Sequence, residues 1–371
     1  MKAVYDREGL LAAFQVVSSV VPARSPKPIL RNVKMIAAPE QSVLMATDLE
    51  VVGIRLEVRG VHVEEPGEAL LPTDRVISIL RESTDQELRI EADKNSCLIQ
   101  GQDSEFELPS DDPAHYPDIP QFEGEDYHQI QAGELARLIR RTIFATMQES
   151  VTFSAGVLWE LGPEKVRLVA TDKRRLAVAD GIGIQHGKHS TEKQMPVVPT
   201  KVMNLLERNL TDEEEQVFVA IRPNDALFKT SRAMIYGRLL EGRYPDYKEA
   251  FPKKVNMKVP LPVGPLLVRV RQAAILTDED SRGVDFSFTK GKLTLKARVP
   301  EKGRGKVEMP VEFEGKGMEV TFDPRFIIDM LKVLDPESEV TLELVDANRA
   351  AILRAGEDYS YIVMPLTREG R

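Results

Sequence analysis

The chain has 371 residues, 42% of them hydrophobic and 29% charged, and a formal net charge of −9 at pH 7. This composition supports packed cores and excludes a largely disordered chain, and no apolar run approaches the roughly 18 residues of a membrane-spanning helix. The charges in Met1–Asp6 exclude a typical signal peptide, the single cysteine excludes an internal disulfide, and the acidic balance by itself argues against a nucleic-acid partner.

The predicted elements follow one order three times along the chain: helix, strands, helix, strands. Apolar residues such as Leu10, Phe14 and Val17 recur at helical spacing in the first helix of each copy, and a proline directly precedes each second helix, where it suits the first turn. The expected first helices are 6–20, 133–147 and 263–275, and the expected second helices are 73–82, 200–209 and 325–334.

Alternating apolar and β-branched stretches predict strands between the helices, and hairpins that turn at Asn or Asp follow each second helix. The expected strands are 33–36, 43–46, 51–58, 166–170 and 294–299, and the expected hairpins begin with 88–93, 217–221 and 340–345. Each copy is therefore expected to be α+β, with an antiparallel sheet and two helices on one of its faces. The segments 118–126 and 247–254 are expected to be short linkers.

Recurring sequence marks show that the three copies share one plan. The runs Leu44–Asp48 and Leu168–Asp172 match, and a weaker match covers Leu293–Ala297. Each run contains one alanine, and these alanines, at positions 46, 170 and 297, are 124 and 127 residues apart. A period this long indicates three similar domains, because solenoid repeats are only about 20–50 residues long.

Candidate catalytic and metal-binding residues do not form a recognisable site in the sequence. His186 and His189 stand three positions apart in a loop, but without further ligands nearby a solvated loop is the simpler interpretation. Asp48 and Asp172 recur after a strand in two copies, which favours a structural turn over acid–base catalysis. The sequence has no phosphate-binding loop, nucleophile elbow or dinucleotide motif, so nothing in it resembles an active site.

Charge is divided unevenly between the helices and the rest of the chain. The six expected helices, counted together with Asp323 directly before the last of them, carry a net charge of +4, which leaves −13 for the remainder. Solvated helical faces of mixed charge are one interpretation of this division. The other is a shared basic surface for a polyanion, which three equivalent domains would place on one side. Such a surface lacks interleaved aromatic residues here, which favours loose backbone contact over base readout.

The chain resembles the bacterial DNA polymerase III beta subunits, the DNA sliding clamps, over essentially its whole length. No single motif would suffice for this resemblance, but a set of motifs occurs in order and at the right spacing. The motifs are Pro28–Leu30, Ala46–Asp48, Ala170–Asp172 with Arg175–Ala177, Gly242–Tyr247, Arg282–Val284 and Tyr361–Pro365.

The resemblance implies an α+β DNA-clamp fold of three similar domains, 1–124, 125–250 and 251–371, each with antiparallel sheets outside and two helices inside. Two copies would join head to tail in a closed ring around duplex DNA, bound without sequence preference. The implied role is a non-catalytic, cytoplasmic processivity factor without cofactors. Its implied partners are a second copy, the DNA polymerase III alpha subunit, the clamp loader and other proteins with a clamp-binding motif. The alternative is a peptide-binding scaffold of the same fold that never encircles DNA.

The resemblance also implies three sets of site residues in this chain. The DNA-facing residues would be Arg24, Arg137, Arg141, Gln148, Phe153, Lys201 and Arg269. The partner-peptide cleft would be formed by Thr171, Arg175, Leu176, Pro245, Ile362, Val363, Met364, Pro365 and Leu366. The dimer seam would contain Asp103, Glu105, Phe106, Leu108, Ile275, Leu276, Lys302 and Arg304.

Three features of this sequence depart from the family pattern. Glu249 stands where many relatives are basic, and Ser281 stands where an aromatic residue is common. Both positions bear on the preference of the cleft for particular peptides. The tail also continues to Arg371, past the usual end.

The two expected seam segments carry opposite charges. Strand alternation puts acidic residues on one face of 103–107, and basic residues alternate in the same way in 302–306. We therefore expect the acidic segment of one copy to pair with the basic segment of the other, with Glu105 and Arg304 as the pair to test. Phe106 is expected to contribute most to stability, while the charges fix the head-to-tail polarity.

Overall fold

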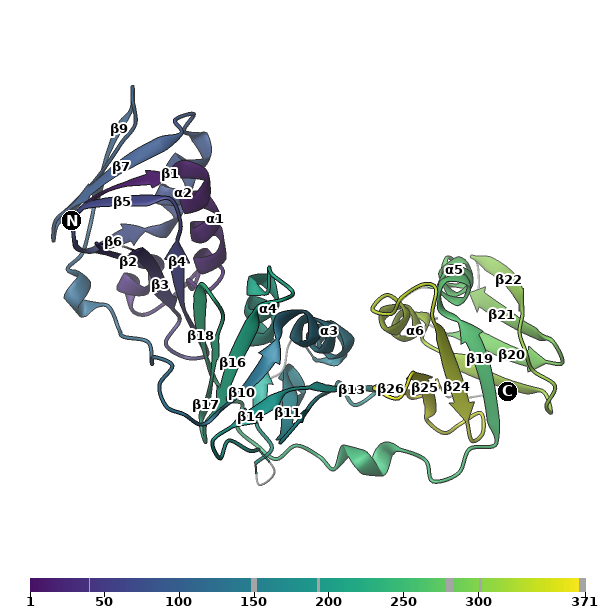
Figure 1. Ribbon diagram of the computed structural model, residues 1–371. Helices are drawn as coiled ribbons and strands as arrows, with labels where there is room; N and C mark the ends of the chain where they lie inside the picture. The colour runs from purple at the N-terminus through teal and green to yellow at the C-terminus, as the bar shows by residue number, and fades with distance from the viewer. Residues whose placement is uncertain (40, 148–151, 192–193, 278–282, 300–301, 367–371) are drawn as a thin grey trace. The chain divides into compact units, whose positions relative to one another are not determined.

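The computed structural model describes residues 1–371 except 40, 148–151, 192–193, 278–282, 300–301 and 367–371 (Figure 1). The chain separates into two compact units, one made of Met1–Glu134 with Gly183–Leu239 and the other of Leu135–Ile182 with Leu240–Arg371. Each unit is α+β, as the sequence predicts. Across the described residues, every helix is too short or too polar to cross a membrane.

The six α-helices found in the described residues fall where the repeat predicts them. They are α1 (Arg7–Ser18), α2 (Thr73–Glu82), α3 (Ala132–Thr142), α4 (Thr200–Asn209), α5 (Val263–Ala274) and α6 (Pro324–Leu331). The largest difference from prediction is in α3, which was expected to reach residue 147. The Thr142 hydroxyl donates to the Leu138 carbonyl at 2.9 Å, and the chain continues as the 3₁₀ turn Ile143–Ala145. Such back-bonding weakens a helix at this point.

Two antiparallel sheets lie in the first unit. A five-stranded sheet has the order β5-β1-β7-β8-β9, with β1 (Lys2–Asp6), β5 (Val61–Glu65), β7 (Glu87–Ala92), β8 (Ser96–Gln100) and β9 (Glu105–Pro109). A nine-stranded sheet has the order β14-β10-β16-β17-β18-β4-β3-β2-β6. Its strands are β2 (Asn32–Ala38), β3 (Gln41–Thr47), β4 (Val52–Val58), β6 (Gly67–Pro72), β10 (Tyr127–Gln131), β14 (Ile184–His186), β16 (Gln216–Ile221), β17 (Asp225–Lys229) and β18 (Ala233–Arg238). The short strand β15 (Val197–Pro199) leads into α4.

The second unit repeats the plan. Its larger sheet contains the strand order β11-β12-β13-β26-β25-β24-β19, with β11 (Gly156–Gly162), β12 (Lys165–Thr171), β13 (Arg175–Ile182), β19 (Met257–Pro262), β24 (Glu339–Leu344), β25 (Ala351–Ala355) and β26 (Tyr359–Val363). A four-stranded sheet has the order β22-β21-β20-β23, with β20 (Val284–Thr289), β21 (Lys292–Val299), β22 (Gly303–Pro310) and β23 (Met318–Phe322).

The helices cover one face of the sheets in pairs. In the first unit α1 packs against α2 and against β3 and β4, and in the second α5 packs against α6 and against β21 and β22 (Figure 1). The apolar stripe of α1 is fully buried at Leu10, Phe14 and Val17, so the helical periodicity identifies the core face correctly. Cys97 is also fully buried, and burial raises the pKa of its thiol to about 12.

The repeated Thr-Asp motif is a structural turn, as predicted. Asp48 Oδ1 accepts backbone N–H groups from residues 50–52 at 3.1, 2.8 and 2.8 Å, and Asp172 Oδ1 accepts those of residues 174–175 at 3.0 Å each. The residue after each aspartate has a positive φ, of 65° and 74°, although neither is glycine. The carboxylate bonds hold the backbone in this disfavoured region and join β3 to β4 and β12 to β13.

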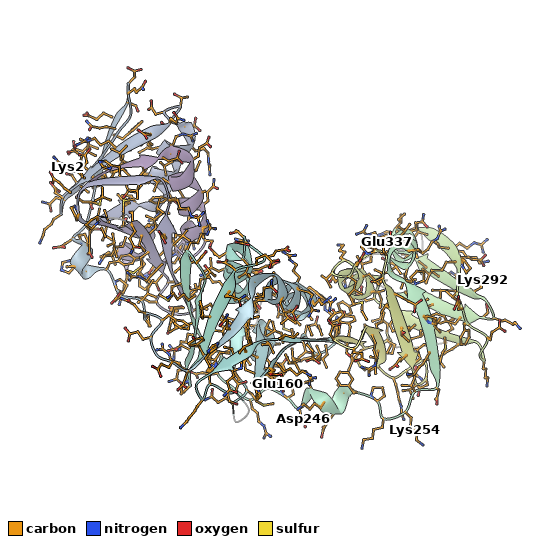
Figure 2. The ribbon with its side chains drawn as sticks, in the orientation of Figure 1. Lys2, Glu160, Asp246, Lys254, Lys292 and Glu337 are labelled. Carbon is orange, nitrogen blue, oxygen red and sulfur yellow. The ribbon has the colours of Figure 1, made fainter. Side chains whose placement is uncertain are left out.

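The expected linker at 247–254 begins with ordered structure. Tyr247–Ala250 forms a 3₁₀ turn, and the buried Tyr247 hydroxyl donates to Glu160 at 2.8 Å (Figure 2 labels Glu160 and the neighbouring Asp246). Arg167 donates to the same hydroxyl at 3.4 Å. Burial and the Glu160 carboxylate raise the pKa of Tyr247, so its hydroxyl stays a donor at neutral pH.

Candidate functional site

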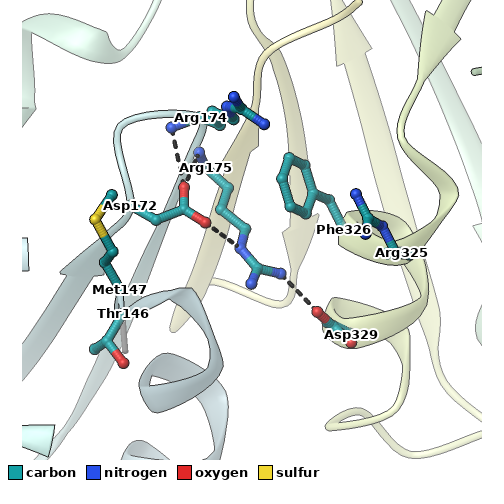
Figure 3. A pocket seen from close by; sticks show the side chains of 8 residues that line it. All are labelled: Thr146, Met147, Asp172, Arg174, Arg175, Arg325, Phe326 and Asp329. Atoms are coloured by element: carbon teal, nitrogen blue, oxygen red, sulfur yellow. Dashed lines mark hydrogen bonds and ion pairs between the residues drawn. The ribbon is translucent and has the colours of Figure 1, made fainter. Parts of the chain in front are cut away.

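Arg175 is the centre of a charged and aromatic cluster in the second unit (Figure 3). Its guanidinium donates to Asp172 Oδ2 at 2.9 Å, to Asp329 Oδ2 at 2.7 Å and to the Phe144 carbonyl at 2.7 Å. The guanidinium also lies over the Phe326 ring, 4.5 Å from its centroid. Only 10% of the Arg175 side chain is exposed, so its charge is neutralised almost entirely by protein groups.

The strand order puts Arg175 next to the C-terminal strand. It begins β13 and stands opposite Val363 in β26, while Leu176 stands opposite Ile362. The next residue, Met364, donates its N–H to the Arg174 carbonyl at 2.9 Å, and its side chain is 45% exposed. An apolar side chain is therefore presented to solvent beside a fixed arginine.

The other predicted cleft residues lie in the same unit, and some are part of its core. Thr171 and Leu176 are buried, and the Thr171 hydroxyl donates to the Arg175 carbonyl at 2.6 Å. Pro245 is exposed. Pro365 and Leu366 are half-buried, and the N–H of Leu366 donates to the Thr321 carbonyl at 2.8 Å. The structure thus fixes the backbone of the C-terminal segment as far as Leu366.

A cavity of about 420 Å³ opens next to the Arg175 cluster. Its lining residues are Thr146, Met147, Asp172, Arg174, Arg175, Arg325, Phe326 and Asp329 (Figure 3). Of these, only Arg175 was predicted as a site residue. Phe326 and Asp329 are one turn apart on α6, and no motif marks them in the sequence. The cavity joins apolar surface from Met147 and Phe326 to several charges, which suits a short peptide better than a small apolar ligand.

Two of the predicted DNA-facing arginines are bound to one carboxylate. Arg137 Nη1 and Arg141 Nη1 donate to Asp358 Oδ2 at 2.5 and 3.0 Å, and Arg137 Nη2 donates to the Asp180 carbonyl at 3.0 Å. The guanidinium of Arg141 also lies over the Tyr359 ring at 5.2 Å. These three ionised groups carry a net charge of +1, so the cluster is basic but partly neutralised.

The remaining predicted DNA-facing residues lie in several settings. Lys201 on α4 is 45% exposed and its Nζ lies 2.7 Å from Asp48 Oδ2 in the same unit. Arg24 is exposed, and Arg269 on α5 is partly exposed and donates to Gln272 at 3.0 Å. Phe153 packs edge-on against Tyr244, with ring centroids 5.3 Å apart. Gln148 lies outside the described residues, as does Ser281.

The predicted seam residues lie on two unpaired sheet edges and the end of one helix. Asp103, Glu105 and Phe106 lie in or just before β9, and the Phe106 side chain is 40% exposed. Leu108, further along β9, is half-buried. Ile275 follows α5 and is 78% exposed.

The basic part of the predicted seam lies in the second unit. Leu276, beside Ile275, is half-buried. Lys302 and Arg304 are exposed at the start of β22, which is an edge strand of the four-stranded sheet.

The prediction of a solvated loop around His186 and His189 is wrong. His189 is buried, and its Nδ1 lies 2.7 Å from Nδ1 of His128, which is itself fully buried on β10. His186 stacks on Tyr127, with centroids 4.6 Å apart. No local pattern marks His128, because 61 residues separate it from His189. Within the described chain, no group of three or more metal-ligating side chains occurs.

Comparisons with known proteins cover the chain from end to end. Its three segments match the families described as DNA polymerase III beta subunit N-terminal domain (residues 1–120), central domain (129–246) and C-terminal domain (248–367). A protein of Pseudomonas putida strain KT2440 named "Beta sliding clamp" is 31% identical over 368 residues, which cover 97% of this chain and 98% of that protein.

Solved structures give the same result. The DNA polymerase III subunit beta of Pseudomonas aeruginosa superimposes with a TM-score of 0.89 at 28% identity, covering 99% of this chain and 100% of that one. The DNA polymerase sliding clamp of Bacillus subtilis gives a TM-score of 0.91 at 25% identity, with 100% of both chains covered.

Proposed function

The chain belongs to the DNA polymerase III beta subunit family, the beta sliding clamps, which are non-catalytic processivity factors, and from this premise we propose that two copies close head to tail into a ring around duplex DNA. The ring would tether the replicative polymerase in the cytoplasm and recruit other proteins through a peptide-binding cleft. The proposed domains are 1–124, 125–250 and 251–371. The matched family segments begin and end within a few residues of these bounds.

The observation that carries the dimer proposal is the incompleteness of two sheets. The nine-stranded sheet joins the strands of two repeat copies through β18 and β4, and the larger sheet of the second unit joins two copies through β26 and β13. By the same plan, β9 of the first repeat and β22 of the third repeat should each have a neighbouring strand. Both end their sheets without one. Joining the five-stranded and four-stranded sheets would produce nine strands in an equivalent order.

Two free edges of complementary plan favour a closed assembly. One edge lies on each unit. If one edge paired with the same edge of a second chain around a two-fold axis, the other edge would stay unpaired. Pairing both edges therefore requires a head-to-tail contact. Head-to-tail contacts close into a ring when the rotation allows it. A second copy is therefore the occupant that both edges fit, since unpaired strand edges bind strands of matching geometry.

Duplex DNA is the proposed occupant of the ring because of the basic helices. Arg24 is exposed, Arg269 is partly exposed, and the cluster of Arg137, Arg141 and Asp358 keeps a net positive charge. Such a surface attracts phosphates without reading bases. Topological enclosure does not need strong contacts, and weak contacts permit sliding.

The proposed partner site combines Met364 with the cavity beside Arg175. An exposed, flexible thioether side chain accommodates different apolar side chains, which suits a site shared by several proteins. The rigid Arg175 cluster would hold the neighbouring backbone in place while partners exchange. The proposed peptides come from the polymerase alpha subunit, the clamp loader and other proteins that carry a clamp-binding motif.

A loading experiment tests this proposal. The labelled chain is incubated with nicked circular plasmid, clamp loader and ATP, and the DNA-bound fraction is isolated by gel filtration. We expect the label to stay with circular DNA and to be lost when a restriction enzyme makes the plasmid linear. Equal retention on linear DNA would contradict enclosure. Peptide binding without any retention on circles would favour the scaffold that does not encircle DNA.

A further inference from the structure

Cross-strand ladders of paired residues run across the sheets of this chain, and they can be compared between copies. In the complete nine-stranded sheet, one ladder crosses the boundary between two copies through the pair Met234–Arg55. This ladder reads Gln129–Phe218–Lys229–Met234–Arg55–Met45–Lys34–Leu70. Its two ends are defined by helices. Gln129 is two residues before the end of β10, which leads into α3, and Leu70 is two residues before Pro72, the N-cap of α2.

The same two landmarks exist on the two incomplete sheets. Val4 is two residues before the end of β1, which leads into α1, and Thr321 is two residues before Asp323, the N-cap of α6. Starting from Val4, the half-ladder reads Val4–Arg89–Gln100–Glu105. Starting from Thr321, the other half-ladder reads Thr321–Asp285–Lys296–Lys306. Glu105 therefore occupies the place of Met234, and Lys306 occupies the place of Arg55.

The second unit gives an independent check of this equivalence. From Pro260, two residues before the end of β19, the ladder reads Pro260–Thr341–Arg354–Ser360–Val178. Ser360 is thus equivalent to Met234. Its partner Val178 stands opposite Val169, three residues before Asp172, as Arg55 stands opposite Met45, three residues before Asp48, so Val178 is equivalent to Arg55. The two complete boundaries have the same register.

From these ladders, and resting on the proposed dimer, we infer that β9 of one copy pairs antiparallel with β22 of a second copy, with Glu105 opposite Lys306, Phe106 opposite Gly305 and Glu107 opposite Arg304. The register puts both acidic residues opposite basic ones. It replaces the pair Glu105–Arg304 expected from the sequence. The partner that this edge selects is a second copy of this chain, because only a strand with basic residues at these two positions matches it.

The charged pairs and the apolar pair lie on opposite faces of the joined strands. A Cβ added to Gly305 would lie 3.1 Å from Leu276 Cδ1, so Gly305 faces the end of α5. Its neighbours Arg304 and Lys306 face the other way. Ile54 and Ile235, which form the pair equivalent to Gly305 and Phe106, are fully buried.

The absence of a side chain at position 305 gives Phe106 room to pack. The Phe106 ring can lie over the Gly305 backbone and against Leu276, where it would lose the 40% exposure that it has in the single chain. A bulky residue opposite a glycine fills such a gap between strands. Any larger side chain at 305 would meet Leu276 first.

The four charged residues can form the inferred pairs. Within the described chain, neither Glu107 nor Arg304 has an ion-pair partner. Lys306 Nζ lies 2.8 Å from Glu308 Oε1, and Glu105 accepts from Gln100 at 2.8 Å. An ammonium group has three donors, so Lys306 can hold Glu308 and Glu105 of the other copy together.

Hydrogen bonds at the complete boundaries define the backbone geometry of the inferred pairs. The backbone N–H of Glu57 donates to the Arg232 carbonyl at 2.8 Å, and the backbone N–H of Asp180 donates to the Asp358 carbonyl at 2.7 Å. These pairs lie two residues from Arg55 and from Val178. Because hydrogen-bonded pairs recur at every second residue of an antiparallel ladder, the positions equivalent to Glu105–Lys306 and Glu107–Arg304 are also hydrogen-bonded pairs. Their Cα atoms are expected about 5.5 Å apart, which is within the range that a disulfide spans.

Disulfide crosslinking tests the register directly. Chains carrying Glu107→Cys are mixed with chains carrying Arg304→Cys, subunits are allowed to exchange, and mild oxidation is followed by a non-reducing gel. We expect a band at twice the 41.6 kDa chain mass in the mixture and not with either chain alone. The one native cysteine, Cys97, is fully buried, so its background is measured with the unmodified chain.

A matched mixture separates this register from its neighbours. Glu105→Cys with Arg304→Cys displaces the two sulfurs by two residues, about 7 Å along the strand, so it should not crosslink. Light scattering first shows whether the chain is a dimer. In a dimer, a crosslink between positions 105 and 304, or no crosslink between 107 and 304, overturns the register and leaves the dimer in place. A chain that remains monomeric at all concentrations overturns both.

A charge exchange tests whether the pairs select the partner. Glu107→Arg and Arg304→Glu should each weaken dimer formation by up to about fivefold per seam, and a chain with both changes should recover. Mixed with the unmodified chain, the doubly exchanged chain should form few mixed dimers. Free mixing of the two chains would overturn the selective role of the charges.

Discussion

Arg175 and Asp329 join two copies of the repeat through an ion pair, with Nη1 of the arginine 2.7 Å from Oδ2 of the aspartate. Arg175 begins β13, and Asp329 lies on α6, 154 residues later in the chain. Because Asp172 and the Phe144 carbonyl accept from the same guanidinium, one side chain holds a turn, a helix and a 3₁₀ segment together.

The first prediction concerns this ion pair. Arg175→Ala leaves two carboxylates of low exposure without their partner, and we expect it to lower the free energy of unfolding by about 2 kcal/mol. Urea unfolding followed by circular dichroism measures the loss. Arg174→Ala is the matched control, because Arg174 is the exposed neighbour in the same cavity. Equal stability of the two variants would contradict the role given to Arg175.

The second prediction concerns the proposed peptide site. Met364→Ala removes exposed apolar surface beside the cavity, and we expect about a fivefold to tenfold loss of affinity for a synthetic peptide carrying the clamp-binding motif of the polymerase alpha subunit. Fluorescence anisotropy measures the affinity. Val268→Ala removes a side chain of similar exposure from α5 and should leave binding unchanged. Unchanged binding by both variants would remove Met364 from the site.

The third prediction uses Asp358 to ask whether Arg137 and Arg141 face DNA. Asp358→Asn removes the carboxylate that neutralises one of the two arginines. If both side chains face the duplex, binding at low salt should strengthen and the dependence of binding on salt should become steeper by about one counterion. Titrations of a labelled duplex at several salt concentrations measure this. A lower unfolding midpoint without a steeper salt dependence would mean that the arginines are structural.

The fourth prediction concerns the turn at Asp48. Burial acts to raise the pKa of this carboxyl, but the bonds from Lys201 and from the backbone N–H groups of Val52 and Val51 outweigh it, so the pKa is lowered. Asp48→Ala would leave these N–H groups unpaired, and we expect a cost of about 2 kcal/mol. Asp48→Asn keeps the turn acceptor and should cost less. Urea unfolding of both variants and the unmodified chain, at neutral and at acidic pH, measures these costs, and equal stability of Asp48→Ala and the unmodified chain would contradict the role of the carboxylate. Because the folded pKa is lowered, this stability is present above the unfolded value of about 3.9 and is lost as pH falls below it.

The fifth prediction concerns the buried histidine pair. His189 Nε2 lies 2.8 Å from the Ile221 nitrogen and 3.1 Å from the Ile221 carbonyl oxygen, and its Nδ1 lies 2.7 Å from His128 Nδ1. Burial lowers the pKa of His189, while the Ile221 backbone and Asp126 oppose this shift. The folded state therefore disfavours the charged ring. The free energy of unfolding should be highest above about pH 6.5, the ordinary pKa of histidine, and should decrease as the pH falls below this value.

A pair of variants measures this pH dependence. The unfolding midpoint in urea is compared at pH 8, 6.5 and 5 for the unmodified chain, His189→Asn and His186→Gln. His189→Asn should be less stable at pH 8 and less sensitive to pH. His186→Gln should keep the sensitivity, because His186 stacks at a partly exposed position. A pH response shared by all three chains would mean that another group is responsible.

The plan of the fold could be predicted from the sequence, because that plan depends on local patterns. Helices α2 and α4 have the predicted bounds, directly after Pro72 and Pro199, and the Thr-Asp motif at Asp48 and Asp172 is a turn as expected. Spacing between equivalent marks also revealed the three copies. Each of these signals acts within a few residues of the chain, where backbone geometry and side-chain periodicity are decided.

Which distant side chains meet could be learned only from the folded chain. His128 and His189, Arg137 and Asp358, and Arg175 and Asp329 are separated by 61, 221 and 154 residues. No local pattern marks such pairs, since their energies come from burial and from geometry that exists only after packing. The inferred seam register shows the same division. The sequence indicated opposite charges at 103–107 and 302–306, but the choice of partner for Glu105 depends on hydrogen-bond ladders that are counted residue by residue across folded sheets.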